Sequence, residues 1–166
     1  MDTHRIYIIG NWKMHGDARS SGKLAEDIRA GAPRLTEAVE VVLCPPSVLM
    51  GVVAERIAAS RIKMGGQDCH AEKEGAFTGN ISAPMLKEAG CSHVIVGHSE
   101  RRQFNHETSA DVSEKAAAAM ASGLIPIVCI GETDQERGAG KAREVVAQQV
   151  AESLPAGAAS GDFMLA

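Results

Sequence analysis

Aromatic residues are scarce in this sequence: Phe, Trp and Tyr together make up 3% of its 166 residues. A hydrophobic core must therefore be built mainly from Ala, Val, Ile, Leu and Met. Hydrophobic residues make up 45% and charged residues 23%, which is ordinary globular usage and excludes a disordered or collagen-like chain. We expect a single domain over residues 1–166, long enough to bury a core.

Long apolar runs and a surplus of positive charge are also missing. The first apolar run, Ile6 to Ile9, is too short for a signal peptide, and no later run approaches the length of a membrane span. The formal net charge is −4 and the basic residues are scattered, which argues against binding to nucleic acid or anionic membranes. We expect no nucleic-acid partner, no membrane association and a cytoplasmic location.

The cysteines lack metal-site spacing. Cys44, Cys69, Cys91 and Cys129 form no C-x-x-C pair, and no histidine stands at zinc-finger spacing from them. This pattern favours buried free thiols over a metal site.

What the sequence does contain is an alternation of strand-like and helix-like segments. Short β-branched runs predict buried parallel strands, at Ile6 to Ile9, Val39 to Leu43, Arg61 to Met64, His93 to Val96, Ile125 to Ile130 and Phe163 to Ala166. Helices are predicted between them, at Ser20 to Ala32, Pro46 to Ser60, Ala83 to Ala89, Ser109 to Ser122 and Gln135 to Leu154.

The order of these segments predicts an α/β fold of five βα units followed by a sixth strand. Two architectures fit this repeat: a doubly wound sheet, or part of a barrel. In both, functional side chains follow the C-terminal ends of the strands.

The segment after the first predicted strand, Gly10 to Gly16, contains Asn11 and Lys13. A lysine at a strand end, near an asparagine that can donate hydrogen bonds, suits an anionic or oxyanionic ligand. The alternative is a solvated lysine in a turn.

The fourth strand leads through Gly97 into His98, where a short helix is predicted to start. A helix N-terminus disfavours the imidazolium form and keeps the ring neutral. A neutral histidine can polarise a carbonyl instead of acting as a base. The alternative is a loop histidine bonded to backbone.

These segments together resemble the triosephosphate isomerase family. Its signature motifs are matched by Gly10 to Met14, Gly75 to Gly79, Gly97 to Arg102 and Cys129 to Glu132, in the family's order and spacing. The resemblance implies an incomplete (β/α)8 TIM barrel. The implied activity is the interconversion of glyceraldehyde 3-phosphate and dihydroxyacetone phosphate through an enediolate, a step of glycolysis and gluconeogenesis.

Residue roles follow from the resemblance. Lys13 is expected to offset the negative charge of substrate and intermediate, and Asn11 to help position the substrate. His98 is expected to be the neutral electrophile, with Glu100 beside it in a supporting proton-transfer or hydrogen-bonding role. No metal or organic cofactor is implied.

A homodimer is also implied by the resemblance. The segment Gly66 to Ser82 resembles a loop that docks into a neighbouring subunit, with Thr78 near its tip and Met14 close to the docking site. Asn80 stands where an acidic residue is common in the family, which puts an intersubunit ion pair with Arg101 in doubt.

The family's general base is a glutamate that follows the sixth strand, and Ala166 precedes that position. We therefore expect the 166-residue chain alone to be poorly stable and inactive. Two other hypotheses stay open: another phosphosugar-handling barrel enzyme, and a non-catalytic partial barrel that serves in binding or assembly.

Overall fold

The computed structural model describes residues 5–159 and 162–166 of the predicted single domain over residues 1–166. Its strands form one parallel sheet in sequential order. They are β1 (Ile6–Asn11), β2 (Val39–Cys44), β3 (Lys63–Gly66), β4 (His93–Val96), β5 (Ile125–Val128) and β6 (Met164–Leu165). A doubly wound sheet would reverse its strand order, so the sequential order confirms the barrel-type alternative.

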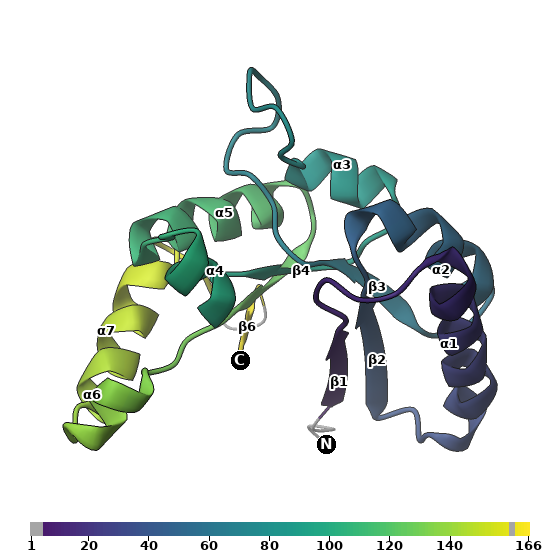
Figure 1. The fold of residues 1–166 in the computed structure, drawn as a ribbon, viewed down its shortest axis with the longest axis horizontal. Helices are drawn as coiled ribbons and strands as arrows, with labels where there is room; N and C mark the ends of the chain where they lie inside the picture. Colours follow the sequence, from purple (N-terminus) through teal and green to yellow (C-terminus); the bar gives the residue numbers. More distant parts are fainter. Residues whose placement is uncertain (1–4, 160–161) are drawn as a thin grey trace.

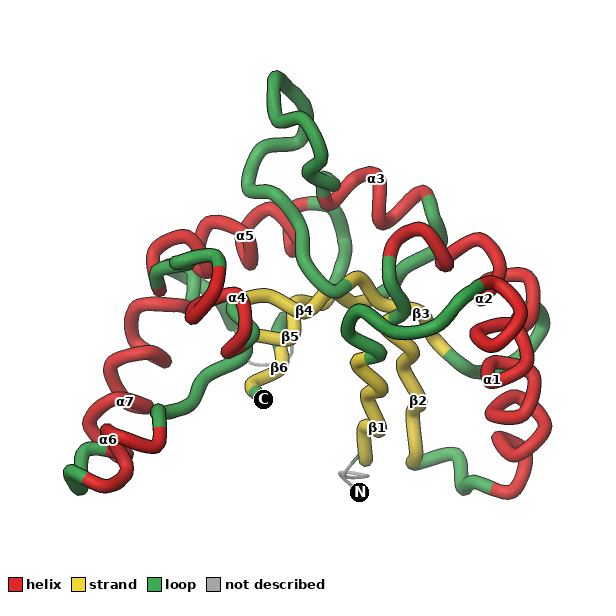
Figure 2. The backbone as a smooth tube through the Cα atoms, viewed as in Figure 1, coloured by secondary structure: helices red, strands yellow, loops and turns green. Residues whose placement is uncertain are grey.

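The helices cover the convex side of this curled sheet (Figure 1). They are α1 (Ala18–Gly31), α2 (Met50–Ile57), α3 (Ala83–Glu88), α4 (Ser99–Phe104), α5 (Ser109–Ala121), α6 (Asp134–Gly138) and α7 (Ala142–Ser153). Two short 3-10 turns, η1 (Ala32–Arg34) and η2 (Ser47–Leu49), follow α1 and precede α2. The same layering is visible when helices and strands are coloured separately (Figure 2).

One helix prediction needs correction, and the start of another helix has a specific cap. The segment Gln135 to Leu154, predicted as one helix, is divided into α6 and α7, because Gly140 adopts a left-handed φ of 72° between them. Helix α5 is capped by Thr108, whose side chain accepts a hydrogen bond from the backbone N–H of Asp111, and Asp111 bonds back to the cap.

Both faces of the sheet carry apolar side chains, because one face packs against the helices and the other forms a second cluster on the concave side. Val41 and Leu43 of β2 pack toward the helices, whereas Val42 and Cys44 face the concave side with Ile95 of β4. The four cysteines are free, as predicted; all are buried except Cys129, which is half-buried.

Strand β1 differs from the prediction of a buried strand. The side chains of Ile6 and Ile8 are 56% and 50% exposed. Their strand pairs only with β2 among the described residues, so nothing described covers its second edge.

His93 lies on the concave face at the N-terminal end of β4, where it is 1% exposed. Its Nδ1 is 2.8 Å from the Ser92 hydroxyl, and its Nε2 is 3.7 Å from Glu40 Oε1 with no hydrogen-bond partner among the described residues. Burial lowers the pKa of His93, with Lys63 acting in the same direction and Glu40 opposing both. The buried ring is therefore neutral near neutral pH.

This burial predicts a pH-dependent stability. Because folding lowers the pKa of His93, the ring is neutral in both the folded and the unfolded state well above the ordinary pKa of 6.5. As the pH falls below that value, the unfolded chain takes up the proton more readily, and the free energy of unfolding decreases. In the full-length protein, His93→Gln is expected to flatten the fall in unfolding free energy between about pH 7 and 5. Urea unfolding at several pH values measures it.

The exposed His106→Asn variant is the matched control and is expected to keep the wild-type slope. Equal slopes for wild type and His93→Gln would show that His93 takes up no proton preferentially in the unfolded state.

Candidate active site

The C-terminal ends of the parallel strands meet at one rim of the sheet, so residues far apart in sequence become neighbours there. Lys13 follows β1, Gln67 follows β3 and His98 follows β4. The structure brings all three to this rim, together with Glu100 from the first turn of α4.

Lys13 has a backbone conformation that is unusual for a residue with a side chain. Its φ is 51°, in the left-handed region. The Lys13 N–H donates to Asn11 Oδ1 at 3.0 Å, so Asn11 closes the turn that holds Lys13. Such conformations cost free energy and persist only where surrounding contacts impose them, which is common at functional sites.

Gln67 supplies the second contact that holds this turn. Its Nε2 donates to Lys13 O at 2.9 Å and to Cys44 O at 2.8 Å, which joins the ends of β1 and β2 through one amide. Sequence reasoning missed Gln67. Its position directly after β3 was the available signal, but only the segments after the first and fourth strands were singled out as candidates.

The Lys13 ammonium lies 2.7 Å from Glu100 Oε1, although the two residues are 87 positions apart in the sequence. Glu100 Oε2 is in turn 3.5 Å from His98 Nδ1. The side chains of Lys13 and Glu100 are about half exposed, at 48% and 46%, and that of His98 is 22% exposed. These three predicted site residues thus form one continuous, solvent-accessible group.

The backbone determines which nitrogen of His98 carries the proton. His98 caps the N-terminus of α4, and its Nδ1 accepts the N–H of Glu100 at 3.2 Å. An accepting Nδ1 carries no proton, so the neutral ring has its proton on Nε2. His98 can therefore donate a hydrogen bond from Nε2 to a ligand oxygen.

Glu100 is an ionised carboxylate at neutral pH. The hydrogen bond from Lys13 is the largest cause that lowers the pKa of Glu100, and the positive charge of Lys13 adds to it. Lys13 and Glu100 thereby hold each other until a more strongly charged ligand competes for the ammonium.

Beside this rim, the loop over residues 67–82 stands away from the body of the chain (Figure 1). A partly buried ionic cluster holds the base of this loop. Asp68 contacts Lys115 Nζ at 2.8 Å and Arg101 NH2 at 2.9 Å, and Glu107 contacts the same two cations at 2.5 Å each. Burial raises the pKa of Asp68 although both cations act to lower it. Arg101, considered above for an intersubunit ion pair, is therefore already paired within its own chain.

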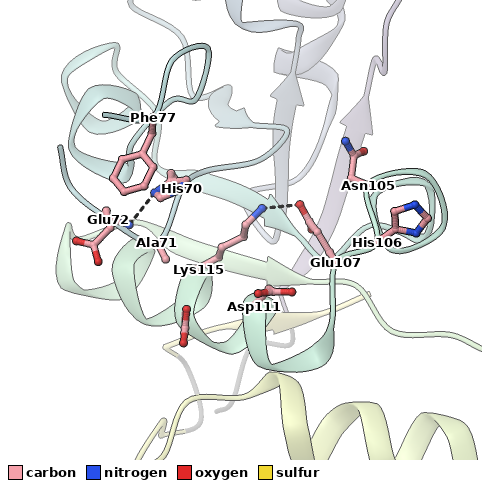
Figure 3. A pocket seen from close by; sticks show the side chains of 10 residues that line it. His70, Ala71, Glu72, Phe77, Asn105, His106, Glu107, Asp111 and Lys115 are labelled. Carbon is pink, nitrogen blue, oxygen red and sulfur yellow. Dashed lines mark hydrogen bonds and ion pairs between the residues drawn. The ribbon is translucent and has the colours of Figure 1, made fainter. Parts of the chain in front are cut away.

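A cavity of about 480 Å3 lies beside this cluster, between the loop and the turn from α4 to α5. Figure 3 shows the side chains that line it. His70 and Phe77 stack on its loop side, with ring centroids 4.0 Å apart, and Lys115 and Glu107 form the opposite side. Neither Lys13 nor His98 lines this cavity.

Met14 and Thr78, the two predicted interface residues, are both on the surface of the chain. Met14 is 93% exposed at the rim, directly after Lys13, and Thr78 is exposed in the long loop. Among the described residues, no hydrogen bond links either of them to the catalytic candidates Lys13, His98 and Glu100.

No helix within residues 5–159 and 162–166 is long and apolar enough to cross a membrane. In the same described ranges, no three His, Cys, Asp or Glu side chains are grouped to hold a metal ion.

Six sequentially ordered parallel strands with helices outside them, and a polar group at the C-terminal rim, define a protein of the (β/α)8-barrel class. Within that class, the chain belongs to the triosephosphate isomerase family, whose sequence model, described as triosephosphate isomerase, matches residues 6–166.

Individual relatives agree with this family. The chain is 49% identical to triosephosphate isomerase from Afipia carboxidovorans over 162 residues, covering 98% of this chain and 64% of the relative. It is 47% identical to the Xanthobacter autotrophicus protein of the same name, covering 99% and 65%. The crystal structure of Bartonella henselae triosephosphate isomerase superposes with a TM-score of 0.90 at 43% identity, covering 97% and 66%. The chain thus spans about two thirds of the length of these relatives.

The role of Gln67 gives a stability prediction. Gln67→Met in the full-length protein removes both hydrogen bonds to carbonyl groups and is expected to lower the unfolding free energy by about 1–3 kcal/mol, because each net bond contributes about 0.5–1.5 kcal/mol. Urea unfolding measures the change.

Gln148→Met is the matched control, since among the described residues the Gln148 side chain bonds only to the exposed Glu152 side chain. It is expected to change the unfolding free energy by less than about 0.5 kcal/mol. An equal, small effect of both substitutions would mean that Gln67 does not stabilise the Lys13 turn.

Proposed function

We propose that the full-length protein carrying this chain is a triose-phosphate isomerase, which interconverts D-glyceraldehyde 3-phosphate and dihydroxyacetone phosphate. The observation that carries the proposal is that Lys13 pairs with Glu100 beside His98 at the strand rim, while the Nδ1 of His98 accepts a backbone N–H and its Nε2 proton is left to donate to a ligand. Membership of the family supports it.

The proposed chemistry moves a proton between two adjacent carbons of the substrate. Removal of the proton next to the carbonyl leaves an enediolate, whose oxygens carry the developing negative charge. The Nε2–H of His98 hydrogen-bonds these oxygens, and the Lys13 ammonium offsets the charge of both the phosphate and the enediolate. Asn11 helps position the substrate through its Nδ2 donor, because its Oδ1 is used in the Lys13 turn.

Glu100 takes a supporting role in this proposal. Its ionised carboxylate keeps the Lys13 ammonium at the rim before substrate binds. The family resemblance assigns the base that removes the carbon-bound proton to a glutamate after the sixth strand. That the 166 residues alone are inactive stays a prediction, as does their organisation as one domain.

We also propose that the protein works in glycolysis and gluconeogenesis in the cytoplasm, on the ground of its family alone. The alternative of another phosphosugar-handling barrel enzyme would require a different electrophile or a lysine that forms a Schiff base. Borohydride reduction in the presence of substrate would trap such a Schiff base covalently on the protein, and the isomerase would remain unmodified.

Substitution of the two charge-stabilising groups tests the proposed activity. In the full-length protein, His98→Gln and Lys13→Met are each expected to lower kcat by at least about 100-fold, since both groups act on charge that develops in the transition state. Coupled assays in both directions, with glyceraldehyde 3-phosphate and with dihydroxyacetone phosphate, measure it.

The control variants are His106→Asn and Lys23→Met, which change an exposed histidine and an exposed lysine away from the rim. Both are expected to keep the wild-type kcat. The proposal fails if the wild-type protein converts neither triose phosphate, and the residue roles fail if either rim variant keeps a near-normal rate.

A homodimer is the proposed assembly. The exposure of Met14 beside Lys13 supports it, as does the long loop that carries Thr78 outward, because large apolar side chains at a surface favour burial against a partner. The buried ions at the base of the loop hold it in place without a partner. The intersubunit ion pair of Arg101 is not needed for this assembly, since exposed pairs contribute little.

Met14→Glu tests the assembly. It places an unpaired charge in the proposed interface and is expected to weaken dimerisation of the full-length protein by at least about 100-fold. Sedimentation equilibrium measures the dissociation constant. Leu24→Glu on α1, which also adds a charge at an exposed apolar position, is expected to leave it unchanged. A wild-type monomer, or a Met14→Glu dimer of normal affinity, would contradict the assignment.

A further inference from the structure

Arg102 of α4 binds four acceptors that come from four different segments. Its Nε donates to Gly97 O at 2.8 Å, and its NH1 donates to Ser109 Oγ at 3.2 Å. Its NH2 donates to Cys129 O and to Ser153 Oγ, at 3.1 Å each. One guanidinium thus connects the turns after β4 and β5 to the start of α5 and the end of α7.

These acceptors are all neutral, although Arg102 is a partly buried cation. Burial lowers the pKa of its guanidinium, which still leaves the group charged at neutral pH. An arginine whose bonds go to carbonyl and hydroxyl oxygens acts as a geometric clamp, because its planar fork presents several N–H groups at fixed angles.

The clamp acts on the residue that precedes His98. Gly97 has a left-handed φ of 68°, and a Cβ there would lie 2.7 Å from Val112 Cγ2 and 3.0 Å from Arg102 NH2. The turn is therefore enclosed by α5 on one side and by the guanidinium on the other. Only glycine fits this position, and its carbonyl direction is set by Arg102 Nε.

The orientation of the His98 ring depends on this turn. Its Nδ1 accepts the backbone N–H of Glu100, a 3.2 Å bond between two residues of the same short segment. The Gly97 carbonyl shares its peptide plane with the His98 N–H, so the direction of this carbonyl sets the φ angle from which the His98 ring and its Nδ1 bond to Glu100 are built.

We propose that Arg102 is a positioning residue for His98: by holding the Gly97 carbonyl against the turn after β5, it fixes both the direction and the tautomer of the imidazole. This role rests on the proposed isomerase function. In this role Arg102 does not contact the substrate. Through its bond to Cys129 O, the end of β5 helps to hold the His98 ring in position.

The test uses Arg102→Gln and Arg102→Lys in the full-length protein. Neither side chain can span Gly97 O and Cys129 O as the guanidinium does. Both are expected to lower kcat by about 100-fold with little change in KM, since a misplaced catalytic group costs about that factor while substrate binding is kept. Added ethylguanidinium is expected to restore part of the rate of Arg102→Gln.

A second readout does not depend on activity. Long-range 1H–15N spectra of the histidine rings report which nitrogen of His98 carries the proton. Wild type is expected to show Nε2–H alone, and Arg102→Gln a mixture of both tautomers. A wild-type protein without isomerase activity would refute the proposed function and leave this tautomer shift as the test of the clamp.

Ser153→Ala is the control, because it removes one bond of Arg102 at α7 and keeps those to Gly97 and Cys129. It is expected to lower stability while kcat and the His98 spectrum stay at wild-type values. If Arg102→Gln does not fold, Arg102→Lys carries the test. The proposal is overturned if an Arg102 variant that folds keeps kcat within about twofold and an unchanged His98 tautomer.

Discussion

The parallel hydrogen-bond ladder, in which each strand pairs with the next in sequence, is the constraint on which the other features depend. Every strand runs in the same direction, so every strand ends at the same rim. Right-handed crossovers then place each helix on the outer side, and the sheet curls with its second face inward. This arrangement leaves the rim as the place where unrelated loops meet, which is why Lys13 and His98 become neighbours.

At the rim, side-chain donors hold backbone conformations that the chain would not adopt by itself. Lys13 and Gly97 both have positive φ values. The amide of Gln67 binds the carbonyl of Lys13, and the guanidinium of Arg102 binds the carbonyl of Gly97. The side chains that face a ligand thus belong to turns whose backbone is held by hydrogen bonds from Gln67 and Arg102. Their geometry is therefore set before a ligand binds.

Charge is arranged differently at the two functional regions. Lys13 and Glu100 are half exposed, where water weakens their attraction and an anionic ligand can compete for the ammonium. The side chains at the base of the long loop are more buried, so the loss of one partner there would leave an uncompensated charge; they are Asp68, Glu107, Lys115 and Arg101. The first arrangement suits an exchangeable contact, and the second suits a fixed support for the loop.

Much of the fold and part of the site were predictable from local pattern. The β-branched runs placed each strand within a few residues, and the motifs around Lys13 and His98 identified the family. The division at Gly140 was missed, because the helical pattern of that segment continues across it. Gln67, Arg102 and the ions around Asp68 were also missed, since each works through a partner 23 or more positions away or through several at once.

The sequence by itself determined the alternation of strands and helices and the residue types available at each strand end, because those depend on periodicity and on neighbours in the chain. Only the tertiary structure decided that Lys13 pairs with Glu100, and which carbonyls Gln67 and Arg102 hold. Those outcomes depend on distances between segments that meet only when the sheet curls, and no local pattern carries that information.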